Sequence, residues 1–202
     1  MSKDLIILVA DKDIKFALTG ILQRHHALNI KKIDYDIFIH PLHDPGVYKQ
    51  AVPFLRPYIN QYEYALVLLD KEGSGQENKT SFKIENEIKK QLEINGWDER
   101  ADVIVFEPEL EIWVWINSDC MAKVIGWNDF YNLKSYIIKN GLWQREKPKP
   151  DRPKKAFNLA LKHVKIPRSS SLFKEIADNV DFGGCTERSF LSVRKILQKW
   201  FK

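Results

Sequence analysis

Two carboxylates stand one residue apart at the end of an apolar run. The run "YALVLL" at 64–69 has the length and character of a buried strand, and Asp70 and Glu72 follow it just before a glycine turn. Alternate residues of an extended segment point the same way, so Asp70 and Glu72 are expected to face one ligand while Lys71 faces away. Their hard oxygen atoms favour Mg²⁺ or Mn²⁺.

Further acids follow other apolar runs of the chain. Asp11 comes after the run at 5–10, and the run at 102–106 is followed by Glu107, Glu109 and Glu111. If these runs are parallel strands, their carboxyl ends share one edge, where ligands bind in open α/β sheets. Crowded carboxylates either raise one another's pKa or recruit a cation. We therefore expect a shared metal or phosphate site, against the alternative that each acid only caps a helix or solvates a turn.

The histidines allow two interpretations. His40, His43 and Asp44 could be ligands at the same edge, but "HPLHDPG" also suits a turn with an Asp-Pro corner. The sequence does not decide between them. Trp113 and Trp115 favour core or domain contacts over base stacking.

Four apolar runs of strand length alternate with helical patterns in the first half of the chain. The expected strands are 5–10, 35–40, 64–69 and 102–106, with helices after the first three, the second broken by Pro53 and Pro57. Helices alone are expected after Pro108, at 109–117, 128–140, 154–164, 170–179 and 187–201. The pattern predicts the α/β class, with about four mainly parallel strands flanked by helices and a C-terminal helical extension.

The charge divides the chain into an acidic front and a basic back. Residues 145–202 hold 15 Lys and Arg against 6 Asp and Glu, a net of +9, whereas residues 1–144 hold 17 against 21, a net of −4. The Pro-rich, charged stretch at 144–155 is the expected linker. We therefore expect an α/β domain over 1–144 and a basic helical extension over 145–202 packed on it. A basic segment attracts the phosphates of nucleic acid.

Composition argues against several classes of protein. With 44% hydrophobic and 29% charged residues, the chain is typical of a folded protein rather than a disordered one. No stretch has the roughly 20 uncharged apolar residues of a membrane span, and no signal peptide is evident, so we expect a cytoplasmic protein without a membrane partner. Cys120 and Cys185 favour buried free thiols over a disulfide framework or a zinc site.

A competing motif lies directly after the third run. "GSGQENKT" at 73–80 is similar to a phosphate-binding loop, with Asn78 in place of the second glycine. It follows a strand and opens a helix, as such a loop must. Asn78 carries a Cβ where the backbone must bend around phosphate, and the acids before the loop oppose an anion. Nucleotide hydrolysis that depends on Lys79 is therefore a minor alternative.

Three stretches together resemble the Toprim-like domain of bacterial phage-defence proteins, the group that contains the RloB-like families. They are the first strand with Asp11, "VLLDKEGSG", and "PELEIW". In that group an acid follows the first strand, an acidic pair follows the third, and a glutamate precedes an x-Trp. The resemblance assigns these roles to Asp11, to Asp70 with Glu72, and to Glu111. Over nearly the whole chain, the sequence is similar to the small proteins of methylation-associated defence systems.

The resemblance implies a role in restricting phage beside other defence-system components, without fixing a reaction. Our hypothesis is a Mg²⁺-dependent (or Mn²⁺-dependent) nuclease or nucleic-acid-processing subunit, in which Asp11, Asp70, Glu72 and Glu111 hold the ion. Lys154, Lys155 and Arg168 would contact the nucleic-acid backbone, and Lys12 would neutralise transition-state charge. The alternative is a non-catalytic sensor or assembly module that binds a partner protein or nucleic acid.

Overall fold

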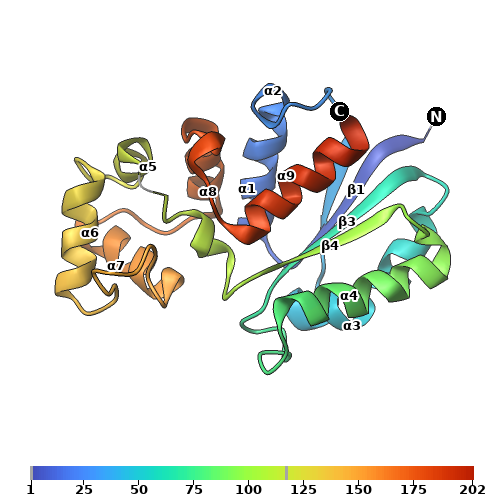
Figure 1. The fold of residues 1–202 in the computed structure, drawn as a ribbon, viewed down its shortest axis with the longest axis horizontal. Helices are drawn as coiled ribbons and strands as arrows, with labels where there is room; N and C mark the ends of the chain where they lie inside the picture. Colours follow the sequence, from blue (N-terminus) through green and yellow to red (C-terminus); the bar gives the residue numbers. More distant parts are fainter. Residues whose placement is uncertain (1, 117) are drawn as a thin grey trace.

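The computed structural model describes residues 2–116 and 118–202, and they contain a four-stranded, all-parallel sheet (Figure 1). The strands are β1 (Lys3–Val9), β2 (Tyr35–Ile39), β3 (Tyr62–Asp70) and β4 (Ala101–Phe106), in the order β2-β1-β3-β4. All four lie where apolar runs predicted them. The predicted α/β class is therefore confirmed.

Helices cover both faces of this sheet, which is why its central strands are apolar on both sides. The covering elements are α1 (Lys12–Gln23), α2 (His25–Leu28), α3 (His43–Leu55), η1 (Arg56–Tyr58), α4 (Ser81–Leu92), η2 (Glu93–Trp97) and α9 (Arg188–Phe201). Figure 1 shows α3 and α4 below the sheet and α1 and α9 above it. Residues 65–69 of β3 are each at most 1% exposed.

The start of α3 differs from the sequence interpretation. "HDPG" was expected to turn the chain, but the helix begins at His43 and includes it, and Pro53 lies inside the helix. Pro45 is tolerated because the first turn of a helix has no N–H partner to lose. Gly46 allows the helix to approach the preceding loop, since a Cβ there would come within 2.2 Å of His40 Nδ1.

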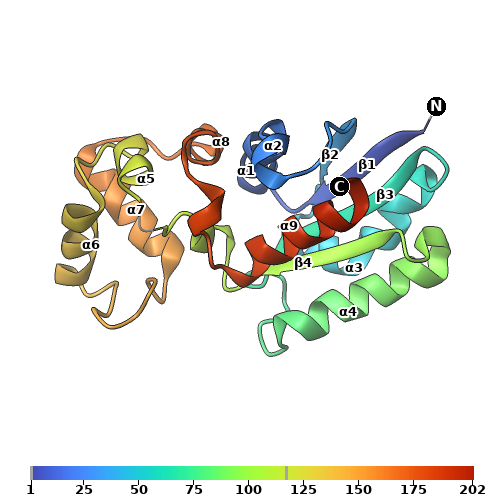
Figure 2. The same cartoon turned by 45° about the horizontal axis from the view of Figure 1, so that its top comes forward.

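A helical lobe lies beyond the carboxyl ends of the strands (Figure 2). We use this name for α5 (Asp119–Val124), α6 (Phe130–Lys139) and α7 (Pro153–Val164), which follow the short helix η3 (Leu110–Trp113). The helix predicted at 109–117 is thus much shorter. The predicted linker at 144–155 connects α6 to α7 and lies within the lobe.

The remaining C-terminal elements return to the α/β core. They are α8 (Ser170–Asn179) and η4 (Phe182–Gly184), followed by α9. Helix α8 packs on α1, where Gly20 permits the contact because a Cβ there would lie 2.8 Å from Ala177 Cβ. Residues 145–202 are therefore shared between the lobe and the core. Cys185 is buried as expected, whereas Cys120 is exposed.

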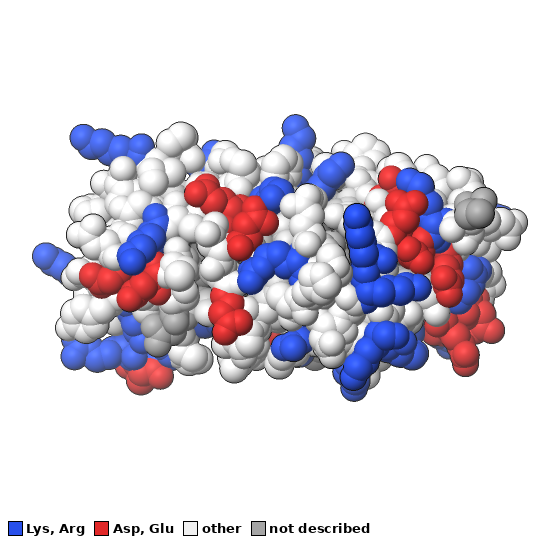
Figure 3. Space-filling model, turned by 90° about the horizontal axis from the view of Figure 1, so that it is seen from above, with Lys and Arg blue, Asp and Glu red and all other residues white. Residues whose placement is uncertain are grey.

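On one face of the molecule, the surface charges do not separate as the sequence halves do. On the face shown in Figure 3, acidic and basic side chains are interspersed. The reason is that the basic C-terminal helices pack against the acidic N-terminal half. Within the described residues, no helix combines the length and the apolar character that crossing a bilayer requires.

Candidate functional site

Asp11 follows β1 and Asp70 ends the neighbouring strand β3, at the point where the strand order reverses. The helix after β1 covers one face of the sheet and the helix after β3 covers the other, so the chain leaves the two strand ends in opposite directions. The register places Val9 beside Leu68, so the two strands end at nearly the same level. This switch point is where the predicted carboxylate site was expected.

Asp70 is the buried centre of the site. Its residue is 5% exposed, and its Oδ1 accepts a hydrogen bond from the backbone N–H of Leu110 at 2.9 Å. Asp44, in the first turn of α3, accepts the N–H of Asp70 through its own Oδ1 at 2.7 Å. Asp11 caps α1 by accepting the N–H of Ile14 at 2.9 Å. Each aspartate thus fixes backbone with one oxygen, and among the described residues no hydrogen bond reaches the Oδ2 atoms.

The three aspartates form a strained set of like charges. Burial raises the pKa of Asp70 well above its usual range, and the charges of Asp44, Glu111 and Asp11 raise it further. Burial likewise raises the pKa of Asp44 to about 6, with Asp11 contributing. The pKa of Asp11 is also raised by burial. Such a set is stabilised by a proton or by a cation.

Glu109 joins the sheet edge to the helical lobe. The residue precedes η3 in an extended conformation and is 6% exposed. Its Oε1 accepts the N–H of Lys154 at 3.0 Å near the start of α7, and its Oε2 lies 3.5 Å from Lys154 Nζ. A carboxylate at a helix N-terminus complements the helix dipole. Burial, followed by the charge of Glu111, raises the pKa of Glu109.

Glu111 is paired with an arginine from the segment between α7 and α8. Its residue is 1% exposed, and its Oε1 lies 2.5 Å from Arg168 Nη2. The same nitrogen lies 2.6 Å from Oδ2 of Asp13, which sequence reasoning missed. Asp13 is also held by the hydroxyl of Ser170 at 2.6 Å. Arg168 therefore ties the start of α1 to η3.

Lys154 is the second cation within the site. Burial acts to lower its pKa, but the charges of Glu111, Glu109 and Asp70 outweigh burial and raise it. The positive charge of the same lysine offsets part of the rise in the pKa values of Asp70 and Asp44. Lys154 and Arg168, predicted as nucleic-acid contacts, thus lie against the acids of the cluster.

Three residues of the predicted site are exposed rather than buried at the sheet edge, although the charge of one of them, Glu72, helps to raise the pKa of Glu109. Glu72 is exposed, because β3 ends at Asp70 and the alternation of an extended strand ends with it. Lys12, the first residue of α1, is exposed beside Asp11, and Lys155 is exposed on α7. Among the described residues, no ion pair involves any of the three side chains.

The histidines after β2 differ in their surroundings. His40 is 2% exposed, and its Nδ1 accepts the N–H of Leu42 at 3.1 Å. Burial, with the charge of His43, lowers the pKa of His40. A ring nitrogen of His43 lies 3.1 Å from the carbonyl oxygen of Ala10. Asp44 is thus the member of this segment that faces Asp70.

The loop that is similar to a phosphate-binding loop is occupied by its own side chains. Oε1 of Glu77 accepts the N–H groups of Gly73 and Gly75 at 2.9 and 3.1 Å. Lys79 Nζ binds Glu87 Oε2 at 2.7 Å and the hydroxyl of Tyr48 at 2.8 Å. The lysine and the glycine N–H groups therefore do not converge on one anion.

The acids at this edge of the sheet are of the ligand type that hard divalent cations prefer. Among residues 2–116 and 118–202, no three His, Cys, Asp or Glu side chains are grouped so that they could hold a metal ion together. Asp11, Asp44 and Asp70 nevertheless supply the carboxylate oxygens that Mg²⁺ prefers, and the charges of these three aspartates oppose one another. A cation could relieve this repulsion.

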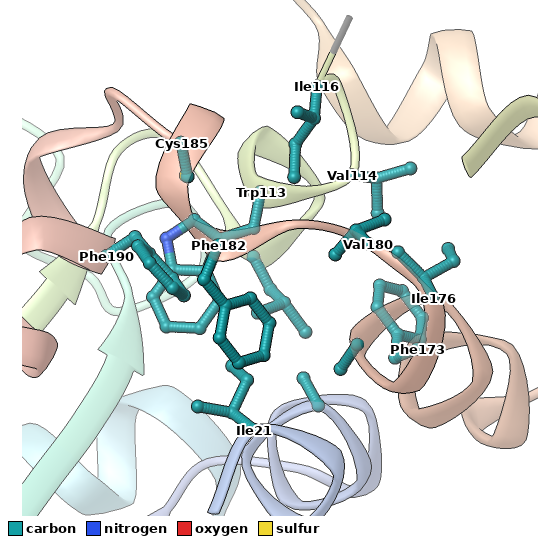
Figure 4. A pocket seen from close by; sticks show the side chains of 13 residues that line it. Ile21, Trp113, Val114, Ile116, Phe173, Ile176, Val180, Phe182, Cys185 and Phe190 are labelled. Atoms are coloured by element: carbon teal, nitrogen blue, oxygen red, sulfur yellow. The ribbon is translucent and has the colours of Figure 1, made fainter. Parts of the chain in front are cut away.

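An apolar cavity among the described residues contains none of the acidic side chains in its lining. It has a volume of about 40 Å³ and lies between α1, η3, α8 and η4 (Figure 4). Its walls include Ile21, Trp113, Phe173, Ile176 and Phe182, and no charged side chain lines it. We interpret it as a packing void between the core and the C-terminal helices.

Comparisons with family models, curated proteins and solved structures find no match to this chain.

Proposed function

We propose that this protein is a Mg²⁺- or Mn²⁺-dependent phosphodiesterase that acts on nucleic acid, as a nuclease or nucleic-acid-processing subunit. The observation that carries the proposal is the set Asp11, Asp44 and Asp70, one buried and two half-buried carboxylates with raised pKa values at the switch point of a parallel sheet. In this proposal Asp44 replaces Glu72, which the sequence analysis expected as a ligand. When bound, the ion would polarise a phosphate and activate water.

The chain's own residues support this chemistry in two ways. Asp70 and Asp44 are held rigidly by backbone N–H groups, so their oxygens need little reorganisation to bind an ion. Lys154 lies among the acids and supplies a positive charge that can bind a phosphate oxygen. Arg168 positions Glu111.

The experiment compares Asp70→Asn with Glu72→Gln. Both exchanges replace a carboxylate by an amide of similar shape, but only Asp70 is buried and in contact with Asp44. We expect Mg²⁺ to raise the melting temperature of the wild type and of Glu72→Gln, and to leave Asp70→Asn unchanged, because a ligand stabilises only a state that binds it. Metal-dependent cleavage of single- or double-stranded DNA or RNA should follow the same order. Equal behaviour of the two variants would contradict the proposal.

A second candidate is a non-catalytic sensor or assembly module. Arg168 pairs with Glu111 and Asp13, and Lys154 pairs with Glu109, so part of the cluster is already neutralised by the chain itself. This observation favours the acids as a structural joint between core and lobe. Binding of nucleic acid or protein without turnover, unchanged in Asp70→Asn, would support the module.

The role in bacterial antiphage defence, beside other defence-system components, depends on the sequence resemblance alone. Phage plating on cells that express the protein with its native gene neighbours tests that role. If the proposal holds, Asp70→Asn should restore plating and Glu72→Gln should not.

A further inference from the structure

The outer face of α6 carries a hollow that the proposed cleavage site does not use. Its volume is about 450 Å³, and its lining consists of Tyr131, Lys134, Ser135, Ile138, Lys139 and Arg145. We call this surface the α6 groove. In Figures 1 and 2, α6 lies on the side of the helical lobe that is farthest from the sheet.

The groove is a consequence of helical spacing. Residues 131, 135 and 138 recur on one face of α6, whereas Phe130, Leu133 and Ile137 are buried on the opposite face. The buried face packs the helix onto the lobe. The outward face is therefore largely free of packing contacts and open to a ligand.

The charge of the groove has a single sign. Residues 130–145 contain three basic residues and no Asp or Glu. Lys139 and Arg145 are exposed, and among the described residues neither forms an ion pair. Lys134 Nζ lies 4.9 Å from the ring centre of Trp143, so its charge is held at the groove. This lining complements a polyanion.

Tyr131 adds an aromatic surface to these charges. The residue is 79% exposed, the largest exposed fraction among the large hydrophobic residues of the described chain. A basic groove with an exposed aromatic ring is the arrangement by which proteins bind unpaired bases, since any base can stack on the ring. In a double helix, each base is stacked between its neighbours, so its flat face is not available to a tyrosine ring.

We propose that the α6 groove binds single-stranded nucleic acid, with Lys134, Lys139 and Arg145 on the phosphates and Tyr131 stacked on a base. The inference rests on the proposed function for its choice of nucleic acid as substrate class. It makes the helical lobe the part of the protein that holds the strand.

The test is fluorescence anisotropy of a labelled oligothymidine and a labelled oligouridine in EDTA. We expect Tyr131→Ala to weaken binding about tenfold and Tyr131→Phe to preserve it, because stacking needs the ring and not the hydroxyl. Lys139→Ala/Arg145→Ala should also weaken binding. It should reduce the slope of log K against log salt by about 1.4, because each lost single-strand phosphate contact accounts for about 0.7.

Matched controls come from α4, which lies on the α/β core rather than in the helical lobe. Phe82 is 69% exposed on α4, and Lys83 and Lys90 are exposed on the same helix. Phe82→Ala and Lys83→Ala/Lys90→Ala should bind as the wild type does, although they remove the same kinds of group. Circular dichroism of each variant checks that it is folded.

Several results would overturn the inference. They are failure of the wild type to bind either oligonucleotide, equal losses in the α4 controls, tighter binding of duplex than of single strands, and a Tyr131-dependent dimer in the absence of nucleic acid. Binding is measured without metal, so the two proposals can fail separately. If the wild type binds the oligonucleotides but does not cleave them with Mg²⁺, the proposed function is refuted and this inference stands.

Discussion

Asp44 accepts a hydrogen bond from the backbone N–H of Asp70, so a carboxylate in the first turn of α3 holds the last residue of β3. The contact joins the segment after β2 to the end of β3. It also brings two like charges together at a desolvated edge. The hydrogen bond therefore stabilises the backbone, while the charge of Asp44 repels the carboxylate of Asp70.

These two effects can be separated by mutation. Asp44→Ala should lower the free energy of unfolding by about 1–3 kcal/mol, because it leaves a buried N–H without a partner. Asp44→Asn keeps an oxygen acceptor and removes the charge, so it should cost much less. Urea denaturation at neutral pH without metal measures both. Equal losses in the two variants would show that the charge, not the hydrogen bond, stabilises the edge.

Arg188 binds Glu85 through two nitrogens, at 2.9 and 3.0 Å, and also donates to the carbonyl of Val105. Glu85 accepts the N–H of Val105. The ion pair therefore satisfies both the N–H and the C=O of Val105 on β4, an edge strand. Arg188→Leu should cost about 1–3 kcal/mol, because a largely buried carboxylate loses its partner while the arginine itself is half-exposed.

The double variant Glu85→Gln/Arg188→Leu is the control for this ion pair. It should recover part of the loss, because no uncompensated charge remains. A thermodynamic cycle of urea denaturation curves gives the coupling. Additive losses would exclude a direct interaction between the two side chains.

Two buried tryptophans differ in how their indole N–H groups are satisfied. Trp115 donates to the carbonyl of Pro153 at 3.1 Å, whereas Trp97 Nε1 is buried without a partner among the described residues. Trp115→Phe should therefore destabilise the protein by about 1–3 kcal/mol more than Trp97→Phe. Thermal and urea denaturation of the two variants provide the comparison. A larger loss in Trp97→Phe would contradict it.

Asp36 links the amino ends of three strands. It accepts hydrogen bonds from Lys3 Nζ at 2.7 Å and from the hydroxyl of Tyr62 at 2.5 Å, and these contacts lower its pKa, Lys3 having the larger effect. A lowered folded-state pKa gives stability that is present above the unfolded pKa and is lost as the pH falls through the folded one. Asp36→Asn should thus destabilise the protein at neutral pH.

The pH dependence provides the internal control for Asp36. The difference in unfolding free energy between wild type and Asp36→Asn should shrink as the pH is lowered below about 4, where an unperturbed aspartate gains its proton. Urea denaturation across that range measures it. A difference that does not change with pH would mean that the amide disturbs packing rather than charge.

Sequence patterns predicted the sheet because a strand covered on both faces must be apolar on both faces. The runs at β1, β3 and β4 satisfy this condition, and parallel strands then bring Asp11, Asp70 and the following glutamates to one edge. The alternation predicted Glu72 beside Asp70, but Glu72 is exposed. The two-residue alternation ended with β3, and no local signal marks the last residue of a strand before a glycine turn.

The amino-acid sequence by itself determined the apolar strands, their α/β order and the edge at which the acids collect, because these depend on neighbouring residues and on burial. Only the tertiary structure decided which charges meet. Asp44 reaches Asp70 across 26 positions, and Arg168 reaches Glu111 across 57. Such pairs depend on how α3 and the helical lobe dock on the sheet, and docking is a property of the whole packed chain rather than of any segment.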